Sequence, residues 1–186
     1  MKKLSLIILA LVLCTAVFAQ NYVPQIKGNS VITYTYTQDG QDLPMILTFN
    51  SLNDPIKIDW SIDGIGSGNY EMSTKALQDG KGMAISAAAP DQLTKLPNYQ
   101  TVACISKAAF NDMVKNNAFE YDDLKFSVKK DDTGACKLGN RTLDVYHAVA
   151  TNGKGEMWIL NNPDFPLVCK TKDNAQGVNL TLVSIK

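Results

Sequence analysis

One short string in the chain has the residue types of a catalytic site, namely Asp132-Thr133-Gly134. Aspartic proteases carry this triplet, and their two catalytic carboxylates share a proton inside a site sheltered from water. The sequence contains the triplet once, so such an activity would require two chains. The polar run Lys129-Lys130-Asp131 precedes it, which favours an ordinary β-turn at the tip of a hairpin.

A second candidate is His147, the single histidine of the chain. It falls in the apolar phase of a predicted strand, together with Leu143, Val145 and Val149. A general base needs a nucleophile and an orienting group beside it, and the sequence locates neither. We therefore predict a hydrogen-bonded histidine in the core or in the wall of a pocket.

Other polar groups give little sign of catalytic or metal chemistry. The acids Asp59, Asp63, Asp122 and Asp123 alternate with apolar residues or sit at turns, which is typical of solvated faces. The glycines from Gly64 to Gly68 lack the lysine and the following helix of a phosphate-binding loop. Neither a cofactor nor a metal site is predicted.

Three cysteines follow the N-terminal region: Cys104, Cys136 and Cys169. Their spacing is not that of a zinc site, and a lone histidine cannot complete one. The pattern favours buried thiols, with one disulfide as the alternative and its pairing undetermined.

The aromatic residues suggest binding rather than catalysis. Tyr34, Tyr36 and Trp60 are predicted to point inward from neighbouring strands, and Trp158 belongs to a later group of strands. With His147 they form our candidate ligand-binding set, since a curved sheet lined by aromatic rings can enclose an apolar ligand. The simpler interpretation is that these rings are core.

The clearest strand pattern in the sequence is at Ile56 to Asp63, which includes Trp60. Large apolar residues (Ile56, Ile58, Trp60, Ile62) alternate there with polar ones, which is the period of a strand with one face buried. Similar patterns and turn signals predict a meander over about 30–75 and a second over about 141–186. Between them one short helix is expected at about 107–116, with Ser106 as its N-cap.

The fold class predicted is therefore mainly β: an antiparallel curved sheet, half-barrel or sandwich built from two meanders. A shift of 111 residues superposes the order of turns in the two meanders, so the halves 30–75 and 141–186 are a possible duplication. In that case the two meanders would face each other across a pseudo-twofold axis.

The first residues have the pattern of a secretory signal peptide. Lys2 and Lys3 precede a short apolar run, and cleavage is expected after Ala19. This leaves residues 20–186 as a single β-rich domain, exported to the periplasm or the cell exterior. Lipid attachment at Cys14 is disfavoured because bulky Leu13 precedes it. Acidic and basic residues balance at 18 each, so no nucleic-acid partner is predicted.

Several short strings carry a resemblance to known families. The chain resembles a family of uncharacterised secreted β-rich proteins of Bacteroidetes through Leu96-Pro97, Ile105-Ser106-Lys107, Met157-Trp158-Ile159-Leu160-Asn161 and Phe165-Pro166-Leu167. The aromatic strand followed by a Pro-Leu strand is also similar to periplasmic lipoprotein-carrier proteins. That similarity implies a curved sheet that shelters acyl chains.

Three functions are compatible with these observations. The leading one is a non-enzymatic binding or carrier module for a hydrophobic, lipid-like ligand. The second is a structural or interaction protein that pairs with a partner through an exposed sheet edge. In that case Pro44 and Pro166 would mark sheet edges where proline limits unwanted strand pairing. The third is a hydrolase that uses His147 or Asp132.

Overall fold

The computed structural model describes residues 21–84, 88–129, 136–174 and 176–186 of the chain. Eleven strands form one large sheet. They are β1 (Ser30–Gln38), β2 (Gln41–Ser51), β3 (Ile56–Ile62), β4 (Gly66–Met72), β6 (Leu93–Lys95), β8 (Ala118–Tyr121), β9 (Leu124–Val128), β12 (Val145–Ala150), β13 (Glu156–Leu160), β14 (Val168–Lys172) and β15 (Val178–Ile185). The order across the sheet is β6-β4-β3-β2-β1-β15-β14-β13-β12-β9-β8. All neighbours are antiparallel except β4 and β6, and the sheet is not closed into a barrel. The predicted fold class is confirmed.

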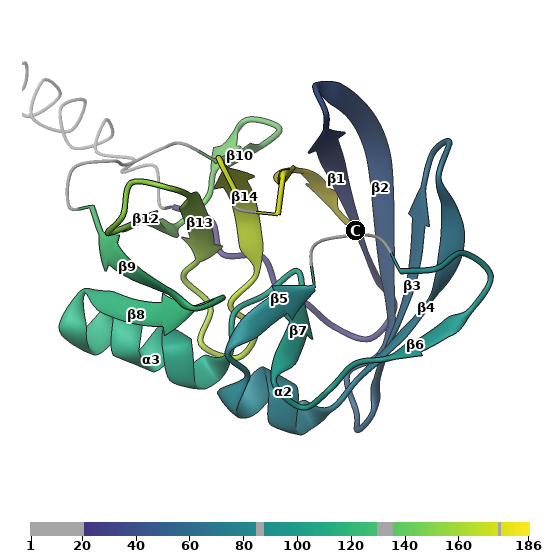
Figure 1. The fold of residues 1–186 in the computed structure, drawn as a ribbon, viewed down its shortest axis with the longest axis horizontal. Coiled ribbons are helices and arrows are strands. Elements are labelled where there is room, and N and C mark those ends of the chain that lie inside the picture. The colour runs from purple at the N-terminus through teal and green to yellow at the C-terminus, as the bar shows by residue number, and fades with distance from the viewer. Residues whose placement is uncertain (1–20, 85–87, 130–135, 175) are drawn as a thin grey trace, which may run out of the picture.

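The sheet consists of two halves (Figure 1). We call β1–β4 with β6 the first half, and β12–β15 with β8 and β9 the second half. They join where β1 pairs with β15, for example Ile32 with Ile185 and Tyr36 with Leu180. The first strand of one meander thus lies beside the last strand of the other. A shift of 111 residues does superpose the strand order of the two meanders; their duplication stays a prediction.

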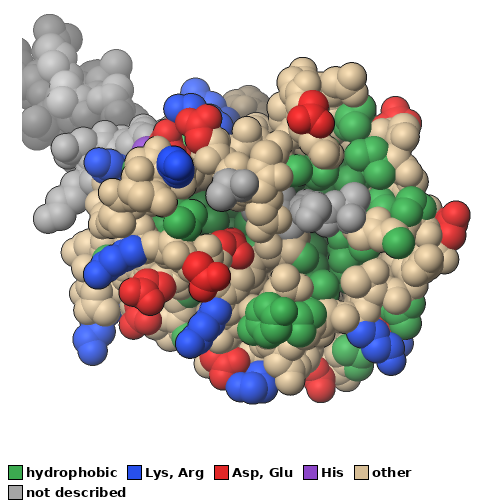
Figure 2. Space-filling view, in the orientation of Figure 1, with side chains coloured by type: hydrophobic (Ala, Val, Ile, Leu, Met, Phe, Trp, Pro, Cys, Tyr) green, Lys and Arg blue, Asp and Glu red, His purple; other side chains and the backbone are tan. Residues whose placement is uncertain are grey.

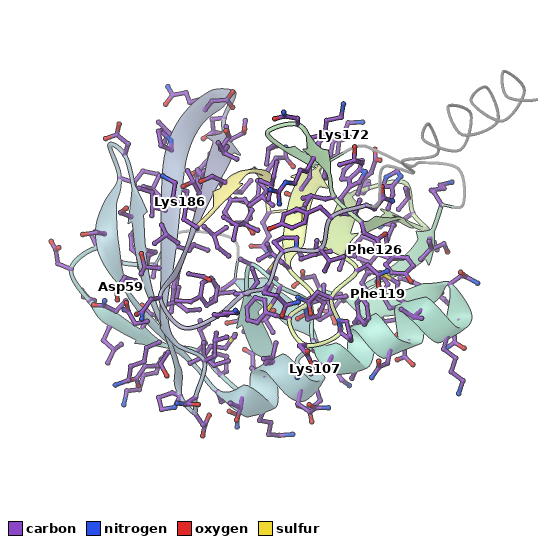
Figure 3. The ribbon with its side chains drawn as sticks, turned by 180° about the vertical axis from the view of Figure 1, so that it is seen from behind. Asp59, Lys107, Phe119, Phe126, Lys172 and Lys186 are labelled. Carbon is purple, nitrogen blue, oxygen red and sulfur yellow. The ribbon has the colours of Figure 1, made fainter. Side chains whose placement is uncertain are left out.

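Strand β3 shows the predicted alternation. Ile56, Ile58, Trp60 and Ile62 are buried on the inner face of the sheet, where they join the hydrophobic core. The polar residues between them lie on the opposite, outer face, and Figure 3 shows Asp59 pointing away from the interior. The side chains of both halves fill the space between them (Figure 3).

Two helices and two small strand pairs complete the described part of the chain. Helix α3 (Lys107–Asn116) begins after Ser106, whose hydroxyl accepts a hydrogen bond from the Ala109 amide, and its buried residues are Ala109, Phe110 and Met113. The pairs are β5 (Gly82–Ala84) with β7 (Gln100–Val102), which is parallel, and β10 (Lys137–Leu138) with β11 (Arg141–Thr142). None of the described helices is long and apolar enough to cross a membrane.

Some elements were not expected from the sequence. Helix α2 (Thr74–Asp79) has six residues, too few to show a helical period, although Ser73 caps it by accepting from the Ala76 amide. Strand β6 lies outside the two meanders expected from the sequence, and it pairs with β4 through backbone bonds such as the Leu96 amide to the Glu71 carbonyl at 2.9 Å.

The hypothesis that Pro44 and Pro166 mark open sheet edges is wrong. Pro44 belongs to β2, between β1 and β3, and its carbonyl accepts from the Asp63 amide. Its nitrogen faces the same side, beyond Ile62 where β3 has ended, so the missing N–H falls at the end of the ladder. The carbonyl of Pro166 accepts from the Ile105 amide. The sheet instead ends at β6 and β8.

The predicted signal peptide at residues 1–19, Cys14 and the Asp132 triplet fall outside the described residues.

Candidate functional site

The inner face of the first half is an apolar and aromatic wall. Alternation along each strand brings side chains into rows across the strands, because opposite residues of antiparallel strands share a face. One row is Ile32, Leu47, Trp60 and Gly68, and the next is Tyr34, Met45, Ile62 and Gly66. All of these side chains except the glycines are buried. Three of the predicted site residues, Tyr34, Tyr36 and Trp60, therefore lie together on this wall.

Trp60 is set into the wall by a glycine. It pairs across the strands with Gly68, where a Cβ atom would lie 2.9 Å from the indole Nε1, so the indole occupies the space that a side chain at position 68 would need. The Tyr70 ring lies 6.3 Å away between centroids. Although Trp60 is only 2% exposed, its indole N–H has no acceptor in the described part of the chain. A buried donor left unpaired costs about 1–3 kcal/mol.

The tyrosine hydroxyls of this wall serve as links to other segments. Tyr34 donates to the Val168 carbonyl at 2.9 Å, across the seam between the two halves. Burial raises the pKa of Tyr34 well above its ordinary value, so the hydroxyl remains a donor. Tyr70 accepts a hydrogen bond from the Ala88 amide at 3.0 Å, which holds Ala88 on the inner side of the sheet.

The chain from Ala88 to β6 then passes along the rim of the wall. Its next described contact is at Gly66, where a Cβ atom would lie 2.8 Å from Cβ of Pro90. The Asp91 amide donates to the Ser67 carbonyl, and β6 follows beside β4. Among the described contacts, the bond from Ala88 to Tyr70, backbone bonds to Ser67 and Asn69 and the short edge strand β6 hold this segment beside the aromatic wall.

The other two predicted site residues, His147 and Trp158, lie on the opposite face of the sheet. His147 pairs with Trp158, Trp158 with Lys170, and Lys170 with Thr181. Thr181 in turn pairs with Thr35, whose chain neighbours Tyr34 and Tyr36 point inward. This row therefore runs along the outer face, and the five predicted residues do not line one site.

The outer row is held by stacking and charge. The imidazole and indole rings are parallel within 6°, with centroids 4.2 Å apart, and the Lys170 ammonium lies 4.6 Å from the indole centroid. Nε2 of His147 lies 2.7 Å from Oε2 of Glu156, and the other oxygen of Glu156 accepts from Lys172 at 3.1 Å. The hydrogen bond from Lys172 is the main cause of the lowered pKa of Glu156, and His147 contributes in the same direction.

This carboxylate–imidazole pair has the geometry by which a carboxylate orients a histidine. The His147 side chain is only 8% exposed, however, so a substrate has almost no access to it. These residues form a packed layer stabilised by charge. His147 is hydrogen-bonded within it, as predicted.

The three described cysteines are free thiols and all are buried. Burial raises the pKa of Cys104 to about 12, and it also raises the pKa of Cys169. Thiols with such pKa values are protonated at neutral pH and unreactive. Within the described residues no group of three His, Cys, Asp or Glu side chains could hold a metal ion.

Sequence reasoning missed two contributors to the aromatic wall. Tyr70 lies within the meander predicted over about 30–75, so its inward position could have been inferred from its alternation with Met72. The close approach of Gly68 to Trp60 depends on strand register, which the sequence does not specify without the turn geometry. Searches against family models, curated proteins and solved structures found no match to this chain.

Proposed function

We propose that the protein binds a hydrophobic ligand with a carbonyl group, of the acyl-lipid class, against the aromatic wall of the first half. The observation that carries the proposal is the Trp60 indole N–H, which is buried among apolar side chains and has no acceptor in the described part of the chain. Ligand sites of this kind combine apolar walls with few polar groups that fix orientation.

The surface above the wall supports the proposal. In the orientation of Figure 2, apolar side chains gather over the first half of the sheet, whereas charged side chains gather over the second half. Partly buried residues that pack against the core from this region include Leu43, Ile65, Ala88 and Leu96. Binding would displace the segment that passes from Ala88 to Pro90 and would break the hydrogen bond from the Ala88 amide to Tyr70. Carriage of an acyl ligand is also the function implied by the resemblance to lipoprotein-carrier proteins.

The first test is native mass spectrometry of the protein purified without detergent from the cells that produce it. We expect a mass excess that fragments to a lipid with an acyl chain. Protein that carries no lipid, and that does not bind monopalmitoylglycerol afterwards, would rule the proposal out.

The second test uses the two tryptophans as a matched pair. Trp60→Phe keeps an aromatic ring and removes the indole N–H, so we expect monopalmitoylglycerol binding to weaken about five- to tenfold. Trp158→Phe makes the same chemical change on the outer face, and binding should stay unchanged. Equal effects of the two substitutions would contradict a site at Trp60.

A further inference from the structure

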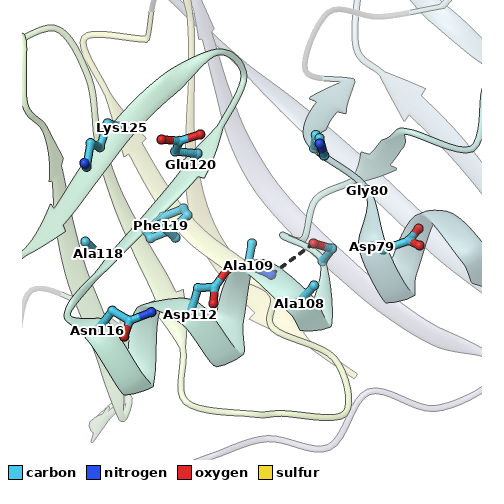
Figure 4. Close-up of a pocket in the computed structure, with 12 residues that line it drawn as sticks. Asp79, Gly80, Ala108, Ala109, Asp112, Asn116, Ala118, Phe119, Glu120 and Lys125 are labelled. Carbon is cyan, nitrogen blue, oxygen red and sulfur yellow. Dashed lines mark hydrogen bonds between the residues drawn. The ribbon is translucent and has the colours of Figure 1, made fainter.

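A groove separate from the aromatic wall lies between α3 and β8, at the end of the large sheet (Figure 4). Its volume is about 490 Å³, within the usual range of ligand sites of about 300–1,000 Å³. One wall is the helical stripe Ala108, Asp112 and Asn116, whose members are four residues apart and exposed. The opposite wall is β8, through Ala118, Phe119 and Glu120.

The register of β8 aims unpaired backbone groups into this groove. Asp122 and Asp123, both with positive φ, form the two-residue turn of the β8–β9 hairpin. In such a hairpin Tyr121 and Phe119 exchange hydrogen bonds with β9, whereas the N–H and C=O of Glu120 and Ala118 point the other way. The bond from the Val128 amide to the Asn117 carbonyl agrees with this register. No other described strand pairs with β8.

The charges of the groove select the kind of partner. Asp112 lines the helical wall and Glu120 lines the strand wall (Figure 4), and neither forms an ion pair within the described residues. A third acid, Asp79, is held by Lys75 at 2.6 Å. Lys81 and Lys125 also line the groove. A cationic side chain bound in the groove would find two carboxylates that are not paired within the described residues.

We propose that the groove binds an extended peptide segment of a partner protein, which adds as a further strand to β8 and places a lysine or arginine between Asp112 and Glu120. Backbone bonds to Ala118 and Glu120 supply affinity, and the two carboxylates supply selectivity, as in other strand-addition sites. The small side chains of Ala108 and Ala118 leave room for the added backbone. This site is independent of the proposed ligand site at Trp60.

The test uses the peptide acetyl-Thr-Lys-Thr-Lys-Thr-amide and amide chemical shifts measured by NMR. We expect shifts confined to Ala118, Glu120 and the facing turn of α3. The fully N-methylated peptide, which cannot pair as a strand, and the peptide with Glu in place of Lys should each bind at least about tenfold more weakly. Equal binding of either control peptide, or shifts at other residues, would overturn the proposal.

Substitutions test the same geometry from the protein side. Asp112→Asn combined with Glu120→Gln should weaken the lysine peptide about tenfold, because both acids are exposed and their charge is all that changes. Asp63→Asn, at the exposed β3–β4 turn, is the matched control and should have no effect. Equal binding by the double variant would overturn the assignment. Concentration-dependent shifts of the Ala118 and Glu120 amides without peptide would show instead that a second copy of the chain occupies the groove.

Discussion

Each half of the sheet contains one tryptophan, and the two are buried on opposite faces among different kinds of side chain. Trp60 lies on the inner face among apolar side chains, 2% exposed, and Trp158 lies on the outer face against His147 and Lys170, 4% exposed. The indole N–H of each lacks an acceptor within the described residues. Similar burial thus arises from a lipid-like surrounding in one half and from a charged layer in the other. The surroundings of a buried aromatic residue, rather than its burial, indicate what it can bind.

The largest effect should come from removing each indole. Trp60→Ala should cost about 4 kcal/mol of unfolding free energy, since it leaves a cavity in the core. Trp158→Ala should cost about 2 kcal/mol, because water can solvate the imidazole and ammonium groups that the indole covered. Urea unfolding measures both values. A larger loss of unfolding free energy for Trp158→Ala than for Trp60→Ala would contradict the difference in surroundings described above.

The ladder between β14 and β15, beside the seam, gives the next effect. A side chain assists this ladder, since the Leu180 amide donates to the Thr171 hydroxyl at 2.8 Å. Thr171→Val removes the acceptor while keeping the shape, so it should destabilise the protein by about 1–3 kcal/mol. Thr181→Val, on the exposed face of β15, should change stability by less than about 0.5 kcal/mol. Equal losses of unfolding free energy in the two variants, measured by thermal or urea unfolding, would show that the buried hydrogen bond does not stabilise the protein.

The two inward tyrosines should differ more modestly. Tyr34→Phe removes the buried bond to the Val168 carbonyl and should cost about 1–2 kcal/mol. Tyr36 donates to the Gln38 side chain at a partly buried position, and its replacement by Phe should cost about 0.5 kcal/mol. Denaturation midpoints at constant slope provide the measurement. Reversal of the order would mean that Tyr34 does not stabilise the seam.

The smallest effects are pH-dependent and of opposite sign at two carboxylates. Burial raises the pKa of Asp122, so ionisation of this group destabilises the fold as pH rises above the ordinary range near about 3.9. Asp122→Asn should therefore raise stability at neutral pH, by about 1 kcal/mol or less. The lowered pKa of Glu156 means the reverse: its contribution is present above its ordinary pKa and is lost as pH falls. Glu156→Gln should lower stability at neutral pH, and unfolding curves measured from acid to neutral pH distinguish the two signs.

Much of the first half could be predicted because one physical signal dominates it. Its strands have one face in the core and one in water, so Ile56 to Ile62 shows its orientation residue by residue. The same alternation correctly placed Tyr34, Tyr36 and Trp60 together on the inner face.

The second half could not be oriented in this way, because β13 is buried on both faces from Met157 to Leu160. No polar face then marks the outside, and the side to which Trp158 and His147 belong follows only from pairing with β14 and β15. Strand β6 was missed for a different reason. It is short, polar and held by backbone bonds, which leave no pattern in the side chains.

The pairing of β1 with β15 has a consequence for folding kinetics. Ile32 meets Ile185, a separation of nearly the whole described chain, so the middle of the sheet can assemble only after residues 178–185 have been synthesised. Until then β1 presents an open edge to the surrounding solution. Topologies with such distant contacts fold slowly and expose strands that can aggregate. Nascent chains of this protein should therefore depend on chaperones more than a simple run of hairpins would suggest.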